Sequence, residues 1–448
     1  MQAAGKWEDV ETLQYITKGE NYNKWQTYDF FHPKGSGIES FREFDFKARQ
    51  YYFKTIAKYG GGYKFEFATV GKDTSRYLYD VNQMRNGKEM SKGNKAIFEA
   101  GFNLNNQFLP YYLLKFVLDS RDSLSTAVTD DGPVVRRHLK SGVVEEYSFS
   151  KDNLQLNKLS LTSSGQLVER YFSDYKDVEQ RKYPKTTKVY VDKTLNTIEH
   201  LTELQINKPF NKQLLIIPEG YVIAAPGPTT LKLSEIAKDV FLIQNITGGR
   251  NMMFVNMDDY VFVTEAPLNS EVSQSLIDLI HKTIPGKPIK YVHLSHFHND
   301  HSNGIRAFVA EGTTLIATSP TIEPLKTIIY DTSLRFKDRL AKEKRAPQFE
   351  SFTGIRILKD KNHEIQLHEI KTTHAEGMSF VYLPKEKIIY EGDLYSLPDD
   401  GTITTAIEAT RSFHAYLKKK RINPERIIGH HGRADINMEI INKAVSMK

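Results

Sequence analysis

The feature that most constrains the fold of this chain is a dense cluster of polar side chains directly after an apolar stretch. Residues 295–301 read Ser-His-Phe-His-Asn-Asp-His and follow the strand-like run 290–294. Only 14 of the 448 residues are histidines, so finding three of them within six positions by chance is improbable. The pattern predicts a loop at the end of a buried strand, where side chains converge on one point.

The same arrangement recurs three times downstream. His374 follows a strand-like run at 365–370, Asp393 follows 387–390, and His431 follows 426–428. Imidazole nitrogens and carboxylate oxygens are ligands of zinc and related divalent ions, and a chain without cysteine offers no thiolate. We therefore predict a metal site at one rim of a sheet. Its ligands are His296, His298, Asp300, His301, His374, Asp393 and His431.

These motifs resemble the metallo-β-lactamase superfamily, whose His-x-His-x-Asp-His signature matches residues 296–301. His374 in Thr-His-Ala-Glu-Gly, Asp393 in Glu-Gly-Asp-Leu-Tyr and His431 before Gly432 match the later motifs of the family. Strand-like runs at 240–243, 251–255 and 261–263 fit its opening. The resemblance covers roughly residues 231–448, and it implies a four-layer αβ/βα sandwich.

The resemblance also implies two metal ions, expected to be zinc, with iron or manganese as alternatives. One ion would be held by His296, His298 and His374. The other would be held by Asp300, His301 and His431, with Asp393 bridging both. His430 is the alternative to His431, but His431 directly precedes Gly432, as the His-Gly pair of the family requires.

The implied chemistry is attack by a metal-bridging hydroxide on a carbonyl-centred bond in a small molecule, with Asp300 and Asp393 as catalytic residues. The aspartate at position 393 resembles the thioesterase and lactonase-like branches, including glyoxalase II, so the candidate bonds are thioester, lactone, ester and lactam. Alternatives are a phosphodiesterase, or a metal-binding or ligand-binding module without hydrolytic activity. The histidine at 298 disfavours the iron redox branch, which typically has a carboxylate there. Tyr395 could place a phenol near the substrate oxyanion.

A chain of 448 residues suggests two domains, and the Pro-Gly-Pro segment within residues 224–230 is the predicted linker. We expect a mainly antiparallel β domain at 1–228 and the metal-dependent domain at 229–448, an α+β chain overall. Strand-like runs at 63–67, 144–149 and 188–191, with turn signals at 86–87 and 164–165, support the first domain. Helices are expected near residues 38–57 and 102–118. The first domain resembles lipoprotein-carrier-like β domains, which implies a scaffold or an apolar-ligand surface.

In the second domain, strands and helices are expected to alternate. Asn269 can cap a helix that ends at Pro285-Gly286, a further helix spans 304–311 before Gly312, and a charged helix pair fills 322–344. A further strand is expected at 314–317. Other histidines are assigned to packing or to the surface: His281, His293, His363, His368 and His414. Glu265 is expected beside the ligands rather than among them.

The net charge of +6 is small for this length and does not call for a nucleic-acid partner. The basic run 418–421 is explained as the last turn of a helix, where cations are favourable. No apolar run approaches the roughly 18 residues of a membrane span. The sequence begins without a hydrophobic signal region. From the carrier-like resemblance we expect a periplasmic or secreted protein, with a cytoplasmic one as the alternative.

Overall fold

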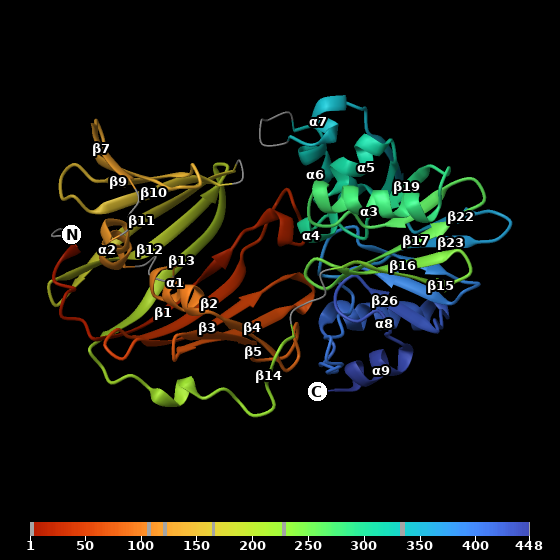
Figure 1. Ribbon diagram of the computed structural model, residues 1–448. Helices are drawn as coiled ribbons and strands as arrows, with labels where there is room; N and C mark the ends of the chain where they lie inside the picture. Colours follow the sequence, from red (N-terminus) through yellow and green to blue (C-terminus); the bar gives the residue numbers. More distant parts are fainter. Residues whose placement is uncertain are drawn as a thin grey trace.

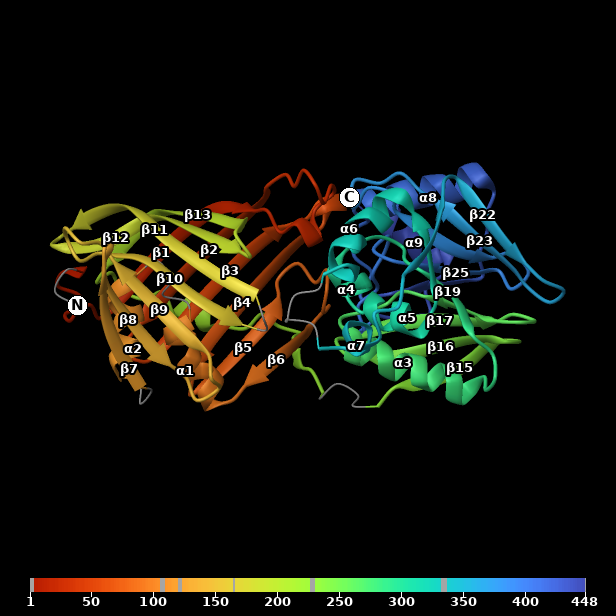
Figure 2. The ribbon, with the colours of Figure 1, turned by 90° about the horizontal axis from the view of Figure 1, so that it is seen from above.

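The computed structural model describes residues 4–104, 109–119, 123–163, 166–225, 230–331 and 337–447. Its strands form three sheets, one of fourteen strands in the N-terminal half and two of seven and five strands in the C-terminal half. The two halves lie side by side, each with its own core (Figures 1 and 2). No helix among the described residues is long and apolar enough to cross a membrane.

The N-terminal sheet has the order β14-β6-β5-β4-β3-β2-β1-β13-β12-β11-β10-β9-β8-β7. Every neighbouring pair is antiparallel except β14 with β6. The predicted antiparallel β architecture is therefore confirmed. Its strands are β1 (Thr12–Asn21), β2 (Ser36–Asp45), β3 (Gln50–Lys58), β4 (Lys64–Lys72), β5 (Ser75–Asp80), β6 (Glu89–Gly93), β7 (Ser123–Thr129), β8 (Gly132–His138), β9 (Val144–Phe149), β10 (Leu156–Ser163), β11 (Gln166–Val178), β12 (Arg181–Val191), β13 (Thr194–Ile206) and β14 (Val222–Ile223).

This sheet curves around two helices, α1 (Lys95–Leu104) and α2 (Pro110–Asp119), as Figure 1 shows. Phe98 and Phe102 of α1 pack with Phe44 and Tyr51 of the sheet in one aromatic cluster. The predicted helix at 102–118 thus exists as two helices that start earlier, at Lys95, and residues 105–108 lie outside the described part. Among the described residues of this half, three short 3-10 helices occupy Lys24–Gln26, Gly60–Gly62 and Lys212–Leu215.

The helix predicted at 38–57 is wrong, because these residues form β2 and β3, which pair with Phe44 opposite Tyr51. The sheet is covered on both faces here. Tyr51 and Phe53 face the α1 cluster, whereas Tyr52 packs on the other face with the segment around Leu214. Burial on both faces puts three aromatic residues, Tyr51, Tyr52 and Phe53, in consecutive positions, so the alternation typical of a half-buried strand is missing there.

The C-terminal half is a sandwich of two sheets with helices outside both, so the predicted α+β class and four-layer αβ/βα fold are confirmed. The first sheet, in the order β15 to β21, contains β15 (Lys232–Ala237), β16 (Val240–Ile246), β17 (Arg250–Asn256), β18 (Val261–Thr264), β19 (Ile289–His293), β20 (Thr314–Thr318) and β21 (Gln348–Phe352). The second contains β22 (Ile355–Lys359), β23 (Glu364–Glu369), β24 (Ser379–Leu383), β25 (Ile388–Glu391) and β26 (Arg426–Gly429).

Three apolar clusters hold these layers together. One lies between the sheets and joins Phe262 to Tyr390. A second packs the first sheet under helices α3 (Ser270–Thr283), α5 (Ile305–Glu311) and α6 (Ser319–Ile329). A third packs the second sheet under α8 (Glu408–Lys420) and α9 (Met438–Ser446). The two remaining helices are α4 (Asn299–Ser302) and α7 (Arg339–Glu343).

Most local predictions for this half hold. The Asn269 side chain accepts a hydrogen bond from the Val272 N–H and caps α3, and Gly312 ends α5 in the left-handed conformation. The basic residues 418–420 form the last turn of α8. The helix pair at 322–344 is shorter than predicted, and residues 332–336 lie outside the described part. Residues 164–165 and 226–229 also lie outside the described part. The turn at 164–165 and the domain boundary at 228 therefore stay predictions.

Candidate metal centre

Four strand ends bring the predicted ligands to one place. His296 and His298 lie after β19, His374 follows β23, Asp393 follows β25, and His431 follows β26. In the second sheet β25 runs parallel to β26, and β23 has the same direction because two antiparallel pairings separate it from β25. The three loops that leave these strands therefore meet at one edge, opposite the loop that leaves β19.

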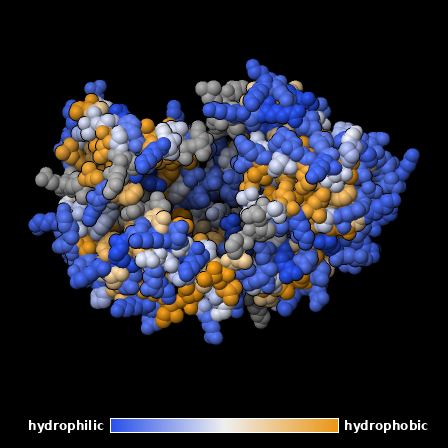
Figure 3. Space-filling model, viewed as in Figure 1, coloured by the Kyte–Doolittle hydropathy of each residue, from blue (hydrophilic) through white to orange (hydrophobic). Residues whose placement is uncertain are grey.

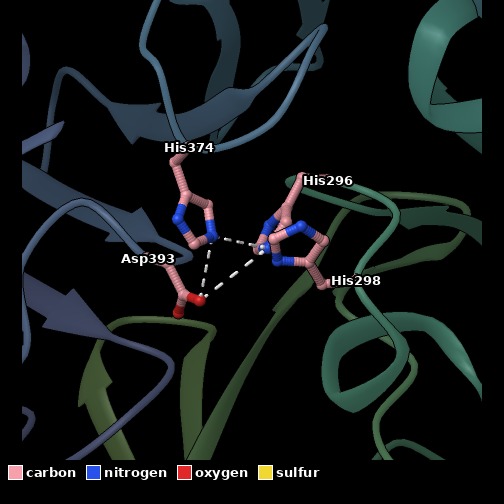
Figure 4. A group of neighbouring side chains, drawn as sticks. All are labelled: His296, His298, His374 and Asp393. Atoms are coloured by element: carbon pink, nitrogen blue, oxygen red, sulfur yellow. Dashed lines mark hydrogen bonds and ion pairs between the residues drawn. The ribbon is translucent and has the colours of Figure 1, made fainter. Parts of the chain in front are cut away.

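The first group of side chains consists of His296, His298, His374 and Asp393, whose candidate ligand atoms all lie within 4.8 Å of one another. The Nε2 atoms of His296 and His374 are 3.3 Å apart. Asp393 Oδ2 lies 3.2 Å from His374 Nε2 and 3.8 Å from His296 Nε2 (Figure 4). Three imidazoles and one carboxylate oxygen thus converge on one point.

The second group lies on the other side of Asp393. The Oδ1 atom of Asp393 is 3.1 Å from His301 Nε2 and 3.5 Å from His431 Nε2. Asp300 Oδ2 is 3.0 Å from His431 Nε2 and 3.8 Å from His301 Nε2. The carboxylate of Asp393 therefore turns one oxygen to each group, which is the geometry of a bridging ligand.

Each imidazole needs a fixed tautomer if it is to present a lone pair to a metal, and its second nitrogen decides this. His301 Nδ1 lies 3.3 Å from the Glu265 carboxylate, and His296 Nδ1 lies 2.9 Å from the Ser295 hydroxyl. As expected, Glu265 stands beside the ligands. His374 and His298 instead have backbone carbonyl partners from the N-terminal half.

The electrostatics of the site favour metal binding. Burial lowers the pKa of His296 well below its usual value and that of His298 to about 3, so both rings are neutral near pH 7. Burial alone would raise the pKa values of Asp300 and Asp393, but the neighbouring His301 and His431 together outweigh it, and both pKa values are lowered well below the usual range. In the first group, neutral imidazoles beside the ionised Asp393 are the form that binds a divalent cation. In the second group burial would lower the pKa of His301, but the carboxylates of Asp393 and Asp300 outweigh it and instead raise that pKa well above its usual value.

Buried atoms without partners test whether the residues fit a metal. Among the described residues, His298 Nδ1 and His430 Nε2 are buried and have no hydrogen-bond partner. Because the other nitrogen of His298 faces a carbonyl, its Nδ1 is the acceptor that a metal would satisfy. His430 lies against His301, with ring centroids 4.2 Å apart, and joins His301 and His431 in a possible metal-binding group. The residues therefore fit metal ions.

The choice between His430 and His431 rests on their contacts. His431 Nε2 faces both Asp300 and Asp393, whereas His430 Nδ1 lies 2.9 Å from the Asn251 carbonyl and from the Tyr390 hydroxyl. His431 is also partly exposed, and His430 is fully buried. This arrangement favours His431 as the ligand and His430 as a residue behind the second group.

The remaining predicted residues lie outside the cluster. His293 is buried and pairs with the Ser379 hydroxyl at 2.9 Å. The Tyr395 side chain is buried in the cluster under α8 and α9, so the structure gives no support to a role at the substrate. The other four histidines pair as follows: His281 with Glu311, His363 with Glu386, His368 with Tyr416 and His414 with Asn442.

Several residues at the site carry no motif, and sequence reasoning missed them. Arg250 Nη2 lies 3.6 Å from Asp300 Oδ2. Gln26 Nε2 donates to Asp300 Oδ1 at 3.0 Å, and the Tyr63 hydroxyl donates to the Asp393 carbonyl at 3.2 Å. Glu391 belongs to the Glu-Gly-Asp-Leu-Tyr motif, but the sequence assigns it no role. It is fully buried, and burial raises the pKa of its carboxyl well above the usual range. Gln26 and Tyr63 come from the N-terminal half, where no sequence signal separates them from other residues.

Access to the site is from the side of the second group. The side chains of Asp300 and His431 are 24% and 23% exposed, while those of His296 and His301 are fully buried. A hollow lined largely by hydrophilic residues opens between the two halves of the molecule (Figure 3). A ligand would therefore approach Asp300 and His431 first.

Comparison with known proteins identifies the family to which the part of the chain that carries these residues belongs. Residues 264–431 match the model of the metallo-β-lactamase superfamily. The C-terminal half belongs to this superfamily. The matched segment begins at the end of β18 and ends at His431, so it contains every predicted ligand. None of the curated proteins matches the chain.

Solved structures similar to the metallo-β-lactamase half include three that are distant in sequence. A metallo-β-lactamase from Pontibacter korlensis is 15% identical and covers 48% of this chain and 98% of its own, with a TM-score of 0.37. The DIM-1 metallo-β-lactamase is 19% identical, over 48% of this chain and 95% of its own, with a TM-score of 0.36. The flavodiiron protein from Giardia intestinalis is 15% identical and covers 48% of this chain and 59% of its own, with a TM-score of 0.35.

Proposed function

We propose that this chain is a dinuclear metal hydrolase that cleaves a carbonyl-centred bond in a small molecule. The observation that carries the proposal is the carboxylate of Asp393, whose two oxygens face two separate groups of nitrogen ligands. The first ion would be held by His296, His298 and His374. The second would be held by Asp300, His301 and His431. Zinc is the proposed metal, because the set contains only imidazole and carboxylate ligands.

Two bound divalent ions supply Lewis acidity, which lowers the pKa of water to about 7 and stabilises negative charge that develops on the substrate. The chain itself keeps Asp300 ionised, so this carboxylate accepts hydrogen bonds and does not act as an acid near neutral pH. Gln26 donates to one oxygen of Asp300, and Arg250 lies beside the other. We propose that Asp300, held in this way, orients the attacking water.

Arg250 lies at the open side of the site, paired with the carboxylate of Asp300. Its side chain is 10% exposed, and Nη1 donates to the Thr247 carbonyl at 2.8 Å, which fixes the guanidinium beside Asp300. Because the Asp300 carboxylate is ionised, the pair carries no net charge, and any positive charge that attracts an anionic group of the substrate would come from the bound metal ions.

The test is the turnover of the zinc-loaded full chain on a thioester, a lactone, a cephalosporin and a phosphodiester. Asp393→Ala is measured beside the wild type, with His414→Ala as a control because His414 lies on the exposed face of α8. The proposal requires turnover of at least one carbonyl substrate, loss of that turnover in Asp393→Ala, and its retention in His414→Ala.

Two results would count against the proposal in different ways. Cleavage of the phosphodiester alone would reassign the chain as a phosphodiesterase. Binding of two metal ions without turnover of any of the four substrates would favour a metal-binding or ligand-binding module.

A further inference from the structure

We propose that the N-terminal half is part of the metal centre, because two of its backbone carbonyls fix the tautomer and direction of two histidines in the first group. The inference rests on the proposed metal centre and extends it to residues outside the superfamily match. His298 Nε2 lies 3.0 Å from the Thr27 carbonyl, and His374 Nδ1 lies 3.1 Å from the Gly60 carbonyl. A carbonyl oxygen can only accept, so each of these nitrogens carries the proton.

The consequence is that the two rings adopt opposite tautomers. His298 is protonated on Nε2 and presents the lone pair of Nδ1, which is buried and has no other partner among the described residues. His374 is protonated on Nδ1 and presents Nε2, which faces Asp393 Oδ2. Both lone pairs are then directed into the first group, as metal binding requires.

The segment around Thr27 is held firmly against the loops that carry the ligands. Gln26 Nε2 donates to Asn299 Oδ1 at 2.7 Å as well as to Asp300. The Phe30 ring packs edge-on against Phe297, between His296 and His298 in sequence, with centroids 5.9 Å apart. The Glu376 N–H donates to the Tyr28 carbonyl at 2.9 Å, two residues after His374. One short segment therefore touches the two loops that carry the histidines of the first group.

The Gly60–Gly62 turn makes an even closer approach to His374. The Gly61 N–H donates to the Thr373 carbonyl at 2.9 Å. A Cβ added to Gly60 would lie 2.5 Å from the His374 carbonyl oxygen, and one added to Gly61 would lie 2.8 Å from His374 Cβ. Gly61 also has a φ of +77°. Glycine is the residue type that allows the backbone to come this close in this conformation.

The second group depends on the N-terminal half much less. His301 takes its partner from Glu265, within its own half of the chain. Among the described residues that would hold the second ion, Asp300 is contacted from the other half through Gln26, and the bridging Asp393 is contacted only at its backbone carbonyl, by Tyr63. Loosening the Gly60–Gly62 turn is therefore expected to weaken the first metal ion selectively. Changes in the partners of ligating histidines typically cost about 10–100-fold in metal affinity.

The experiment compares Gly61→Ala with Gly142→Ala in the full chain. Gly142 has a φ of +84° in the turn between β8 and β9, and a Cβ there meets nothing within 4 Å, so it matches the backbone strain without touching the site. Zinc stoichiometry and affinity are measured by competition with a chromophoric chelator. We expect one of the two zinc ions to bind roughly 10–100-fold more weakly in Gly61→Ala and both to bind normally in Gly142→Ala.

A second measurement uses the wild-type chain and does not depend on how a variant folds. Nitrogen NMR of ¹⁵N-histidine-labelled protein reports which ring nitrogen carries the proton. The proposal requires Nε2–H for His298 and Nδ1–H for His374. Equal zinc affinity in Gly61→Ala and the wild type, or the same tautomer in both rings, would overturn it and leave the proposed hydrolase intact. A wild-type chain that binds no zinc would instead overturn the proposed function and this inference together.

Discussion

The two halves of the molecule bury their side chains to different depths, and this difference explains where the chemistry lies. In the C-terminal half every residue of β18 is buried, as are all residues of β17 except the last, because the sheet is covered on both faces. In the N-terminal half β7 contains no buried residue, and the sheet continues as a broad antiparallel surface. Strands that are fixed on both faces hold ligands at their ends rigidly. The loops that reach across to these ligands leave the covered part of the N-terminal sheet, between β1 and β2 and between β3 and β4, and not its open end at β7.

The largest difference between the two halves is expected when a buried core residue of one and an exposed residue of the other are each replaced by alanine. Phe254 is fully buried in β17 and stacks on Phe241 with centroids 4.8 Å apart. Phe254→Ala is expected to lower the free energy of unfolding by about 3–5 kcal/mol, because it removes apolar contacts and leaves a cavity. Val128→Ala in exposed β7 should change it by less than about 0.5 kcal/mol. Urea denaturation measures both, and a loss below about 1 kcal/mol for Phe254→Ala would contradict the packing described.

Removal of a ligand from the second group should sharpen the contrast between the two metal sites. His301→Ala takes away a fully buried imidazole that faces both Asp300 and Asp393. We expect the second zinc ion to bind more than about 100-fold more weakly, because removing a ligand lowers metal affinity more than removing the hydrogen-bond partner of a ligand, which costs about 10–100-fold. The result should complement that of Gly61→Ala, which is expected to weaken the first ion. Identical binding profiles of the two variants would contradict the division into two groups.

The buried His368 makes the stability of the C-terminal half sensitive to acid. Burial lowers its pKa from the ordinary 6.5 to about 4, and the nearby Lys420 adds to this. Below pH 6.5 the unfolded chain binds a proton that the folded chain refuses, so stability is complete above that pH and falls as the pH drops toward 4. The loss between pH 7 and pH 5 is expected to be about 1–2 kcal/mol.

His368→Gln is the variant that tests this dependence. It removes the titrating group, so the fall in unfolding free energy between pH 7 and pH 5 should be smaller than in the wild type. His414→Gln, which replaces an imidazole on α8 that pairs with Asn442, is measured beside it as the matched control. An unchanged slope in His368→Gln would assign the acid sensitivity to other groups.

The smallest expected effect concerns a single hydrogen bond between the two halves. The Tyr63 hydroxyl donates to the Asp393 carbonyl, and the ring packs edge-on against His374 with centroids 5.3 Å apart. Tyr63→Phe keeps the ring and removes the hydroxyl, so unfolding should become easier by about 1 kcal/mol. Both zinc ions should remain bound. Tyr171→Phe, on an exposed face of β11, is the control and is expected to have no measurable effect. Loss of a zinc ion in Tyr63→Phe would give the phenol a larger role than the structure indicates.

Much of the C-terminal half could be predicted because its sequence signals are local. Asn269 caps the helix that follows it, Gly312 ends α5, and the strands before the ligands are short apolar runs bounded by polar residues. The helix predicted at 38–57 was wrong for the converse reason. Its aromatic residues are buried on both faces of the N-terminal sheet by elements far away in the chain, and no local pattern records that.

The sequence by itself determined which side chains could bind metal, because imidazole and carboxylate groups at the ends of apolar strands identify themselves by type and spacing. Only the tertiary structure decided which nitrogen of each imidazole is free and what holds it. The Thr27 and Gly60 carbonyls that orient His298 and His374 come from residues more than 250 positions away in the chain, and every residue has a carbonyl. A backbone oxygen has no sequence signature, so its role becomes visible only when the fold places it.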